Sequence, residues 1–196
     1  MSVFRPLGAR LSKLTSVGSL AVLGLYPLLV YFGLKYLSGA WVAGLLIALS
    51  LLRLAVRTGR FARLQIVIVC AGGVLLAVLS LVKRSPDLVL YYPALVNGAL
   101  LLAFAHSLAY PPTVVERLAR LRDPELSPRA VAYTRRVTIA WVAFFLFNGS
   151  AAVYTASATS HETWALYNGV IAYVLIGLMF AGEFLTRMYV LRSSSP

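Results

Sequence analysis

Runs of about 20 mostly apolar residues recur along this chain, and no other feature limits its fold so strongly. Residues 88–110 and 164–186 are two such runs, each long enough to cross the hydrocarbon core of a bilayer as a helix. The sequence is 60% hydrophobic and only 12% charged. A soluble domain carries about 25% charged residues and still exposes much of its surface to water. The sequence therefore predicts an all-α, polytopic membrane helical bundle.

We expect a single integral membrane domain over residues 1–196, with six transmembrane helices. An amphipathic loop, residues 111–136, separates the fourth span from the fifth. The first apolar run is long for a signal peptide and no clear A-x-A cleavage site follows it, so we expect it to be retained. The predicted spans cover residues 17–37, 38–55, 64–82, 88–110, 137–157 and 164–186.

Basic residues are distributed unequally between the two sides of this six-span arrangement. All but three of the 18 Lys and Arg residues fall on the side that carries both termini and the second and fourth loops. The exceptions are Lys35, Lys83 and Arg84. Cytoplasmic loops are enriched in Lys and Arg, so we expect both termini in the cytoplasm. The net charge of +12 also predicts contacts with anionic lipids, whereas no basic motif with interleaved aromatic residues points to nucleic acid.

Helix signals occur inside the fourth loop, which we expect to be cytoplasmic. Thr113 is a predicted helix cap, and Glu116 follows it by three residues in a capping-box pattern. Pro124 is expected to end this short helix. Ser127 followed by Pro128 then predicts the start of a helix that leads into the fifth span.

The short helix of the loop has two different faces. Leu118 and Leu121 fall with Val114 on an apolar face, and we expect Glu116 among the charged residues on the other face. This pattern is typical of a helix that lies on the membrane surface. The loop is either a solvated linker with good helix caps or a docking site for a partner protein or anionic lipid. The docking site would use Arg117, Arg120, Arg122, Arg129, Arg135 and Arg136.

The segments LYPLLVYFG and YYPALVNG both place Tyr-Pro, followed by x-Leu-Val, inside an apolar run. Proline inside a helix removes a backbone hydrogen bond, which lipid tolerates when neighbouring groups satisfy the freed carbonyl. We therefore expect Pro27 and Pro93 to kink the first and fourth spans against other helices. Tyr26 and Tyr92 are expected to be local hydrogen-bond partners or interface anchors.

Short sequence matches relate the two halves of the chain. The Tyr-Pro pair recurs between spans one and four, and Ala-Trp-Val-Ala recurs at residues 40–43 and 140–143, which open spans two and five. Three spans per half would give the halves opposite topology, as in many transporters. Matches this short also arise by chance in so biased a sequence. A 3+3 inverted repeat and chance similarity both stay open.

Three asparagines are predicted to be buried in the membrane: Asn97, Asn148 and Asn168. Polar side chains at this depth are costly and usually face other helices or a cavity. They either form hydrogen bonds between helices or line a polar substrate site between spans four, five and six. Close approach of the helices would be helped by small residues, namely Gly33, Gly98, Gly149, Gly169 and Gly177.

Few residues indicate acid–base or metal chemistry. Glu183 lies near the cytoplasmic end of span six with Arg187 four residues later, so it forms either an ion pair or a proton or ligand site. His106 and His161 are predicted at opposite membrane faces, and Cys70 is the one cysteine, so we expect no metal and no cofactor. No nucleophile, base and oxyanion donor come together, so we expect no enzyme.

Several stretches in order resemble the intracellular septation protein A family of small bacterial inner-membrane proteins. They are PLLVYFGLKYLSGAWVAGLLI, the basic turn RTGRFARLQ, DLVLYYPALVNGALLLAF and RRVTIAWVAFFLFNGSAAVYTASATSHETWALYNGVI, which together cover about residues 25–185. The last stretch is the most recognisable, with Trp141, Phe144, Phe145, Asn148 and Trp164. The chain departs from the family in having Tyr-Pro where Lys-Pro is usual. It looks closer still to a divergent group encoded beside aryl-polyene and fatty-acid-like biosynthesis genes.

The resemblance implies a non-enzymatic protein of the bacterial inner membrane. Its implied role is cell-envelope maintenance or septation-linked envelope biogenesis, through lipids or other inner-membrane proteins. The alternative is a small transporter or flippase for an amphipathic, polyene-type molecule, motivated by the repeated Tyr-Pro pair and the buried polar residues. A membrane-embedded transferase, with a cleft at Glu183 or His106, ranks third. The sequence assigns no oligomeric state.

Overall fold

The computed structural model describes residues 60–192 together with the isolated positions 32, 44 and 48. No strand occurs within 60–192, so the predicted all-α class is confirmed for this part of the chain. Its elements are α4 (Arg60–Val82), the 3-10 helix η1 (Pro86–Tyr91), α5 (Tyr92–Ala109), α6 (Val114–Arg120), α7 (Pro128–Ala158), α8 (His161–Leu166), the π-helix η2 (Tyr167–Ile171) and α9 (Ala172–Arg192).

Three helical segments within 60–192 are long and apolar enough to cross a membrane: Asp87–Ala109, Pro128–Ala158 and His161–Met188. They match the last three predicted spans. The predicted third span corresponds to α4, which includes the apolar helical stretch Val69–Val82. The first two predicted spans, with Tyr26 and Pro27, lie outside the described residues. The six-helix count and the inverted repeat therefore stay predictions.

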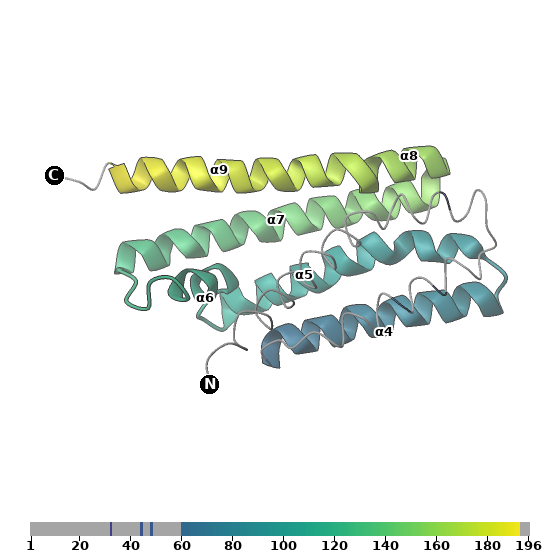
Figure 1. Ribbon diagram of the computed structural model, residues 1–196, viewed down its shortest axis with the longest axis horizontal. Coiled ribbons are helices and arrows are strands. Elements are labelled where there is room, and N and C mark those ends of the chain that lie inside the picture. The colour runs from purple at the N-terminus through teal and green to yellow at the C-terminus, as the bar shows by residue number, and fades with distance from the viewer. Residues whose placement is uncertain (1–31, 33–43, 45–47, 49–59, 193–196) are drawn as a thin grey trace, which may run out of the picture.

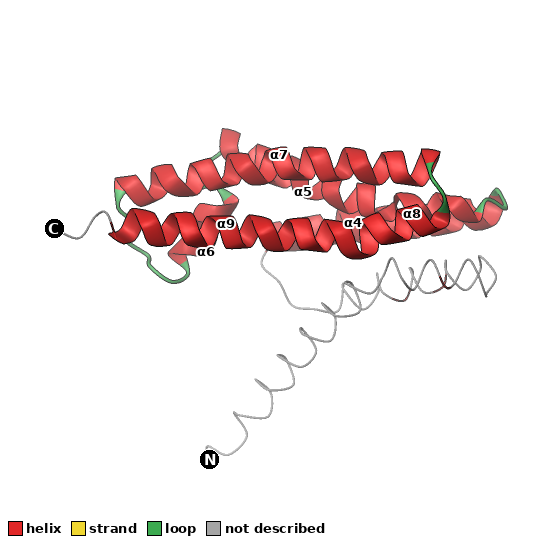
Figure 2. Ribbon diagram, turned by 90° about the horizontal axis from the view of Figure 1, so that it is seen from above, coloured by secondary structure: helices red, strands yellow, loops and turns green. Residues whose placement is uncertain are grey.

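The four long helices lie side by side in chain order, α4, α5, α7 and α9 (Figure 1). Figure 2 shows the same helices from above. α5 and α7 form the most closely packed pair. α9 meets α7 through large side chains, and the rings of Trp141 and Phe180 lie 4.9 Å apart between their centroids. We call the end that holds α6, the start of α7 and the end of α9 the basic end.

α9 exposes apolar side chains from Tyr173 to Met188. Val174, Leu178, Phe184 and Leu185 are each more than half exposed. Removing apolar surface from water stabilises a fold by about 25 cal/mol per Å², so this exposure in water would be costly. In a bilayer these side chains contact hydrocarbon, so facing outward does not carry the free-energy cost that it carries in water.

Pro93 is the second residue of α5, directly after η1. Pro93 thus lies within the candidate span Asp87–Ala109, where a 3-10 helix becomes an α-helix, and the kink stays a prediction. A 3-10 turn pairs each carbonyl with the N–H three residues later, and proline has no N–H to offer the Leu90 carbonyl. The buried Trp164 indole Nε1–H donates to that carbonyl at 3.0 Å. A neighbouring helix thus satisfies the freed acceptor, as lipid requires.

Tyr92 is buried, with 5% of its surface exposed. It belongs to a cluster with Val89, Leu90 and Trp164 that joins η1, α5 and α8 to α4. Of the two alternatives for Tyr92, this burial favours a local partner over an interface anchor, because the ring is enclosed by other helices.

The helix caps of the fourth loop are confirmed. The Glu116 backbone N–H donates to Thr113 Oγ1 at 3.2 Å, and α6 begins at the next residue, Val114. The Ala130 N–H donates to Ser127 Oγ at 3.3 Å, and Pro128 is the first residue of α7. α7 then runs unbroken into the apolar region, as the sequence predicts.

The orientation of α6 differs from the prediction in one respect. Leu118 and Leu121 are 60% and 84% exposed, so the apolar face points away from the bundle, as a membrane-surface helix requires. Glu116 was expected on a solvated face but is only 5% exposed. A salt bridge to Arg120, with 2.8 Å between Arg120 Nη2 and Glu116 Oε1, compensates the buried carboxylate.

We predict that Trp164→Phe lowers the free energy of unfolding by about 1–3 kcal/mol beyond the loss of ring area, because it leaves the Leu90 carbonyl buried without its donor. Thermal unfolding of the purified chain in detergent measures this. Trp141→Phe is the matched control, since it removes a buried indole that donates to no described residue. Equal destabilisation by the two variants would contradict the role of the hydrogen bond.

Candidate functional site

A chain of hydrogen bonds crosses three helices in the interior. Tyr167 Oη donates to Asn148 Oδ1 at 3.0 Å, and Asn148 Nδ2 donates to Asn97 Oδ1 at 3.0 Å. Asn97 Nδ2 in turn donates to the carbonyl of Pro93 at 2.9 Å. Both asparagines are buried, with 8% and 4% exposure for Asn97 and Asn148. The two asparagines therefore lie at the same depth, and the geometry favours hydrogen bonding between helices.

Asn168 belongs to a second, neighbouring set of bonds. Its Nδ2 donates to Thr155 Oγ1 at 3.1 Å and to the Trp164 carbonyl at 3.0 Å. Tyr167 and Asn168 are adjacent in sequence yet both bond to α7. The π-helix η2 makes this arrangement, because its wider turn changes which side chains face the neighbour. Nothing in the sequence pattern predicted this turn.

Close helix approach is confirmed at Gly149, where an added Cβ would lie 3.1 Å from the Asn97 Cβ. The prediction of close helix approach is wrong at Gly98 and Gly177, where an added Cβ would meet no atom within 4 Å. Gly72, which the sequence did not single out, lies against Leu95 so closely that a Cβ would come within 2.5 Å of its side chain. Small residues therefore matter at α4–α5 and α5–α7 contacts, which agrees with membrane helix packing.

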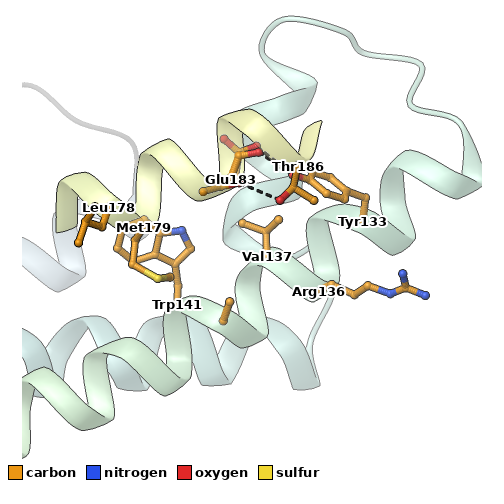
Figure 3. Close-up of a pocket in the computed structure, with 10 residues that line it drawn as sticks. Tyr133, Arg136, Val137, Trp141, Leu178, Met179, Glu183 and Thr186 are labelled. Atoms are coloured by element: carbon orange, nitrogen blue, oxygen red, sulfur yellow. Dashed lines mark hydrogen bonds between the residues drawn. The ribbon is translucent and has the colours of Figure 1, made fainter. Parts of the chain in front are cut away.

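A groove opens between α7 and α9 at the basic end (Figure 3), with a volume of about 380 Å³. It lies away from the Asn97–Asn148 pair, so the predicted polar residues do not form one site. Its lining residues are Tyr133, Arg136, Val137, Ala140 and Trp141 from α7, with Leu178, Met179, Gly182, Glu183 and Thr186 from α9.

Glu183 is the acidic residue of this groove and is only partly buried, with 22% of its side chain exposed. The predicted ion pair with Arg187 is present, with 3.7 Å between Arg187 Nε and Glu183 Oε1. The Tyr133 hydroxyl donates to the Glu183 backbone carbonyl at 3.0 Å and lies 3.5 Å from Oε1. The sequence did not predict Tyr133, which is 50 residues away and carries no local signal of the contact.

Three of the six loop arginines bind groups within the fold. Arg117 Nε donates to the Pro112 carbonyl at 2.9 Å, and Arg135 Nη1 donates to the Leu108 carbonyl at 3.0 Å. Arg120 pairs with Glu116 and also donates to the Pro124 carbonyl at 2.9 Å. Carbonyls near helix C-termini lack N–H partners within the helix, and an arginine side chain can donate hydrogen bonds to them.

The other three loop arginines, Arg122, Arg129 and Arg136, are exposed. Within residues 60–192, their guanidinium groups form no hydrogen bond or ion pair. These three guanidinium groups remain available to groups outside this part of the chain. The other three are less available, because they already bind groups of the fold.

The two histidines lie at opposite ends of the described helices. His161 Nε2 is 3.1 Å from Asp87 Oδ1 at the start of α8, and both side chains are about half exposed. His106 lies near the end of α5, with its ring 4.7 Å from that of Tyr110. Among the described residues, no group of three His, Cys, Asp or Glu side chains could hold a metal. The expected lack of a metal or cofactor stays a prediction.

Comparison with known proteins finds two similar curated proteins, each named "Inner membrane-spanning protein YciB". The protein from Erwinia tasmaniensis is 28% identical over 178 residues, which cover 85% of this chain and 95% of the relative. The protein from Hydrogenovibrio crunogenus is 25% identical over 170 residues, or 83% of this chain and 77% of the relative. No protein-family model and no solved structure matches.

These relatives confirm the resemblance to the septation protein A family that the sequence stretches indicated. The similarity extends over most of the chain. The further resemblance to a group encoded beside aryl-polyene genes stays a prediction.

We predict that Asn148→Leu lowers the free energy of unfolding by about 1–2 kcal/mol, because it strands both Asn97 Oδ1 and the Tyr167 hydroxyl. Asn97→Leu combined with Asn148→Leu should cost less than the sum of the single changes, since both act on one chain of bonds. Unfolding of the full chain in mixed micelles by titration with denaturing detergent measures these energies.

Ser150→Ala is the control for Asn148→Leu, because the Ser150 hydroxyl is exposed and donates to the Leu146 carbonyl of its own helix. Strict additivity of the two asparagine changes would mean that they do not share a network.

Proposed function

We propose that this chain is a non-enzymatic protein of the bacterial inner membrane that supports cell-envelope maintenance or septation-linked envelope biogenesis. It acts through contacts with lipids and other inner-membrane proteins. The similarity to two proteins named as inner membrane-spanning supports the location. Both termini are expected in the cytoplasm, with the basic end on the same side.

The single observation that carries the proposal is the cationic surface of the basic end. Arg122 and Arg129 are exposed at the border between α6 and α7, and Arg122 directly follows the exposed Leu121. A helix such as α6 binds an anionic membrane surface in two ways. Its apolar side chains are buried in the membrane, and the unpaired arginines next to it are attracted to the negative charge. Each arginine near such a surface contributes about 1 kcal/mol. An acidic segment of a membrane partner would be recognised by the same groups.

The hydroxyl groups of the groove support binding rather than catalysis. The Tyr133 hydroxyl donates to the Glu183 backbone carbonyl, and Thr186 Oγ1 donates to the Gly182 carbonyl at 2.8 Å. The Tyr133 hydroxyl also lies 3.5 Å from Glu183 Oε1, but its shorter hydrogen bond, like that of Thr186, is to a backbone carbonyl, which does not activate the oxygen as a nucleophile. A transferase centred on Glu183 would need a hydroxyl paired with a base, so this hypothesis has the least support.

A small transporter or flippase for an amphipathic molecule is the second candidate. The observation that favours it is the groove, which has polar and apolar ends. Transport sites usually lie near the bilayer midplane, between repeats, whereas the asparagines at that depth are bonded to one another. The first proposal therefore fits the described residues better.

We predict that replacing Arg122 and Arg129 together by Gln abolishes envelope protection while leaving protein levels unchanged. Losing two charges removes about 2 kcal/mol of attraction, or about 30-fold in affinity. The measurement is complementation in the source bacterium deleted for its own copy, read as dye leakage and septum placement, with copurification of membrane partners.

Lys83 and Arg84, exposed at the opposite end of the described helices, give the matched control. Replacing both by Gln makes the same change in net charge and should preserve protection. Full protection by the Arg122/Arg129 variant, or equal loss in the control, would remove the basis of the proposal.

A further inference from the structure

The groove between α7 and α9 has a defined depth in the membrane. α7 has 31 residues and is about 46 Å long, which exceeds the hydrocarbon thickness of about 30 Å. Arg136 is its last charged residue, so the apolar part of α7 begins at Val137. Tyr133 and Arg136 therefore belong at the level of the lipid headgroups, and Ala140 and Trp141 lie below them.

The wall that α9 contributes to the groove also changes from polar to apolar residues toward the membrane interior. The bond from Tyr133 to the Glu183 carbonyl sets these two residues at the same level. Toward the membrane interior, Met179 packs against the aromatic cluster around Trp141. Both walls thus change from polar to apolar in the same direction (Figure 3).

The space in the groove comes from a missing side chain. Gly182 lines it, and a Cβ added there would meet no atom within 4 Å. The volume of about 380 Å³ falls within the range of small-molecule sites, about 300–1,000 Å³. Because α7 and α9 are each candidate membrane spans, an amphiphile in the bilayer reaches this space without crossing water.

The groove carries one charge of each sign on its polar part. The Glu183 carboxylate has its nearest cation, Arg187, at 3.7 Å, which is longer than a hydrogen bond and leaves acceptor positions open. The Arg136 guanidinium is exposed and forms no ion pair with another described residue; its side chain extends away from Glu183 in Figure 3, so it meets a headgroup by turning across the rim. An acidic and a basic group on facing helices match a headgroup that also holds both charges.

We propose that this groove binds one phospholipid whose zwitterionic headgroup carries a primary ammonium, namely phosphatidylethanolamine. The ammonium binds the Glu183 carboxylate, and the phosphate binds the Arg136 guanidinium. The first part of an acyl chain lies against Trp141 and Met179. This inference deepens the proposed function by naming a lipid partner, and it rests on that function for the membrane location.

The chemistry of the headgroup explains why other abundant lipids fit less well. A primary ammonium donates charge-assisted hydrogen bonds to a carboxylate, which the quaternary ammonium of phosphatidylcholine cannot do. Phosphatidylglycerol carries a phosphate for Arg136 but no cation for Glu183, so it adds nothing to the contacts at 3.5 Å and 3.7 Å that the carboxylate already has with Tyr133 and Arg187.

The test is native mass spectrometry of the full chain from detergent micelles, with phosphatidylethanolamine, phosphatidylcholine or phosphatidylglycerol of identical acyl chains added in turn. The expected result is one retained phosphatidylethanolamine per chain, at least tenfold more than either other lipid. Glu183→Gln and Arg136→Gln should each reduce this adduct by about tenfold, the loss of one charged hydrogen bond. Glu183→Gln preserves shape and the backbone bond to Tyr133, so it tests binding without removing that contact.

Gly182→Leu should abolish the adduct by filling the groove. Gly177→Leu is the matched control, because Gly177 also has open space around it on α9 but does not line the groove. Equal retention of the three lipids, or equal loss by the two glycine variants, overturns the proposal. Preferred retention of phosphatidylglycerol that depends on Arg136 but not Glu183 overturns it in favour of an anionic-lipid site. None of these outcomes alters the Arg122/Arg129 complementation result, so the two proposals fail separately.

Discussion

The need to satisfy every polar group without water is the constraint on which this structure depends. In hydrocarbon, an unpaired carbonyl or amide costs several kcal/mol. Pro93 creates one such carbonyl at Leu90, and Trp164 satisfies it from another helix. The same constraint joins Tyr167, Asn148 and Asn97 into one chain. These bonds fix how α5, α7 and η2 are rotated relative to each other, which apolar packing against lipid does not.

The two ends of the described helices are built differently as a result. At the end with η1 and α8, the hydrophobic cluster around Trp164 is buried and the pair of Asp87 and His161 lies at the surface. At the basic end, arginines bind the carbonyls that α5 and its following turn leave unpaired. Three of the six loop arginines thus bind groups of the fold, and the proposed contacts with lipids or partners fall to the other three. This division explains why the loop arginines are not equivalent.

The spacing of α9 from α7 follows from side-chain size. Trp141, Phe144 and Phe145 form a bulky cluster on α7, and α9 packs on it through Ile176, Met179 and Phe180. Aromatic rings keep the helices apart where small residues would bring them together. Beyond the cluster, Gly182 adds no side chain, and the separation remains as the groove. A stabilising contact therefore creates the space that a ligand would use.

The sequence by itself determined the membrane class, the position of the last three spans, the caps at Thr113 and Ser127 and the pairing of Glu183 with Arg187. Each of these depends on residues within a few positions of one another or on the length of one apolar run, so the physics is local. Only the tertiary structure decided that Trp164 binds the Leu90 carbonyl, that Tyr133 meets Glu183 and that Glu116 points inward. The first two of these contacts join residues 74 and 50 positions apart. They depend on the rotation and separation of whole helices, which the packing of many side chains sets together and no local pattern encodes.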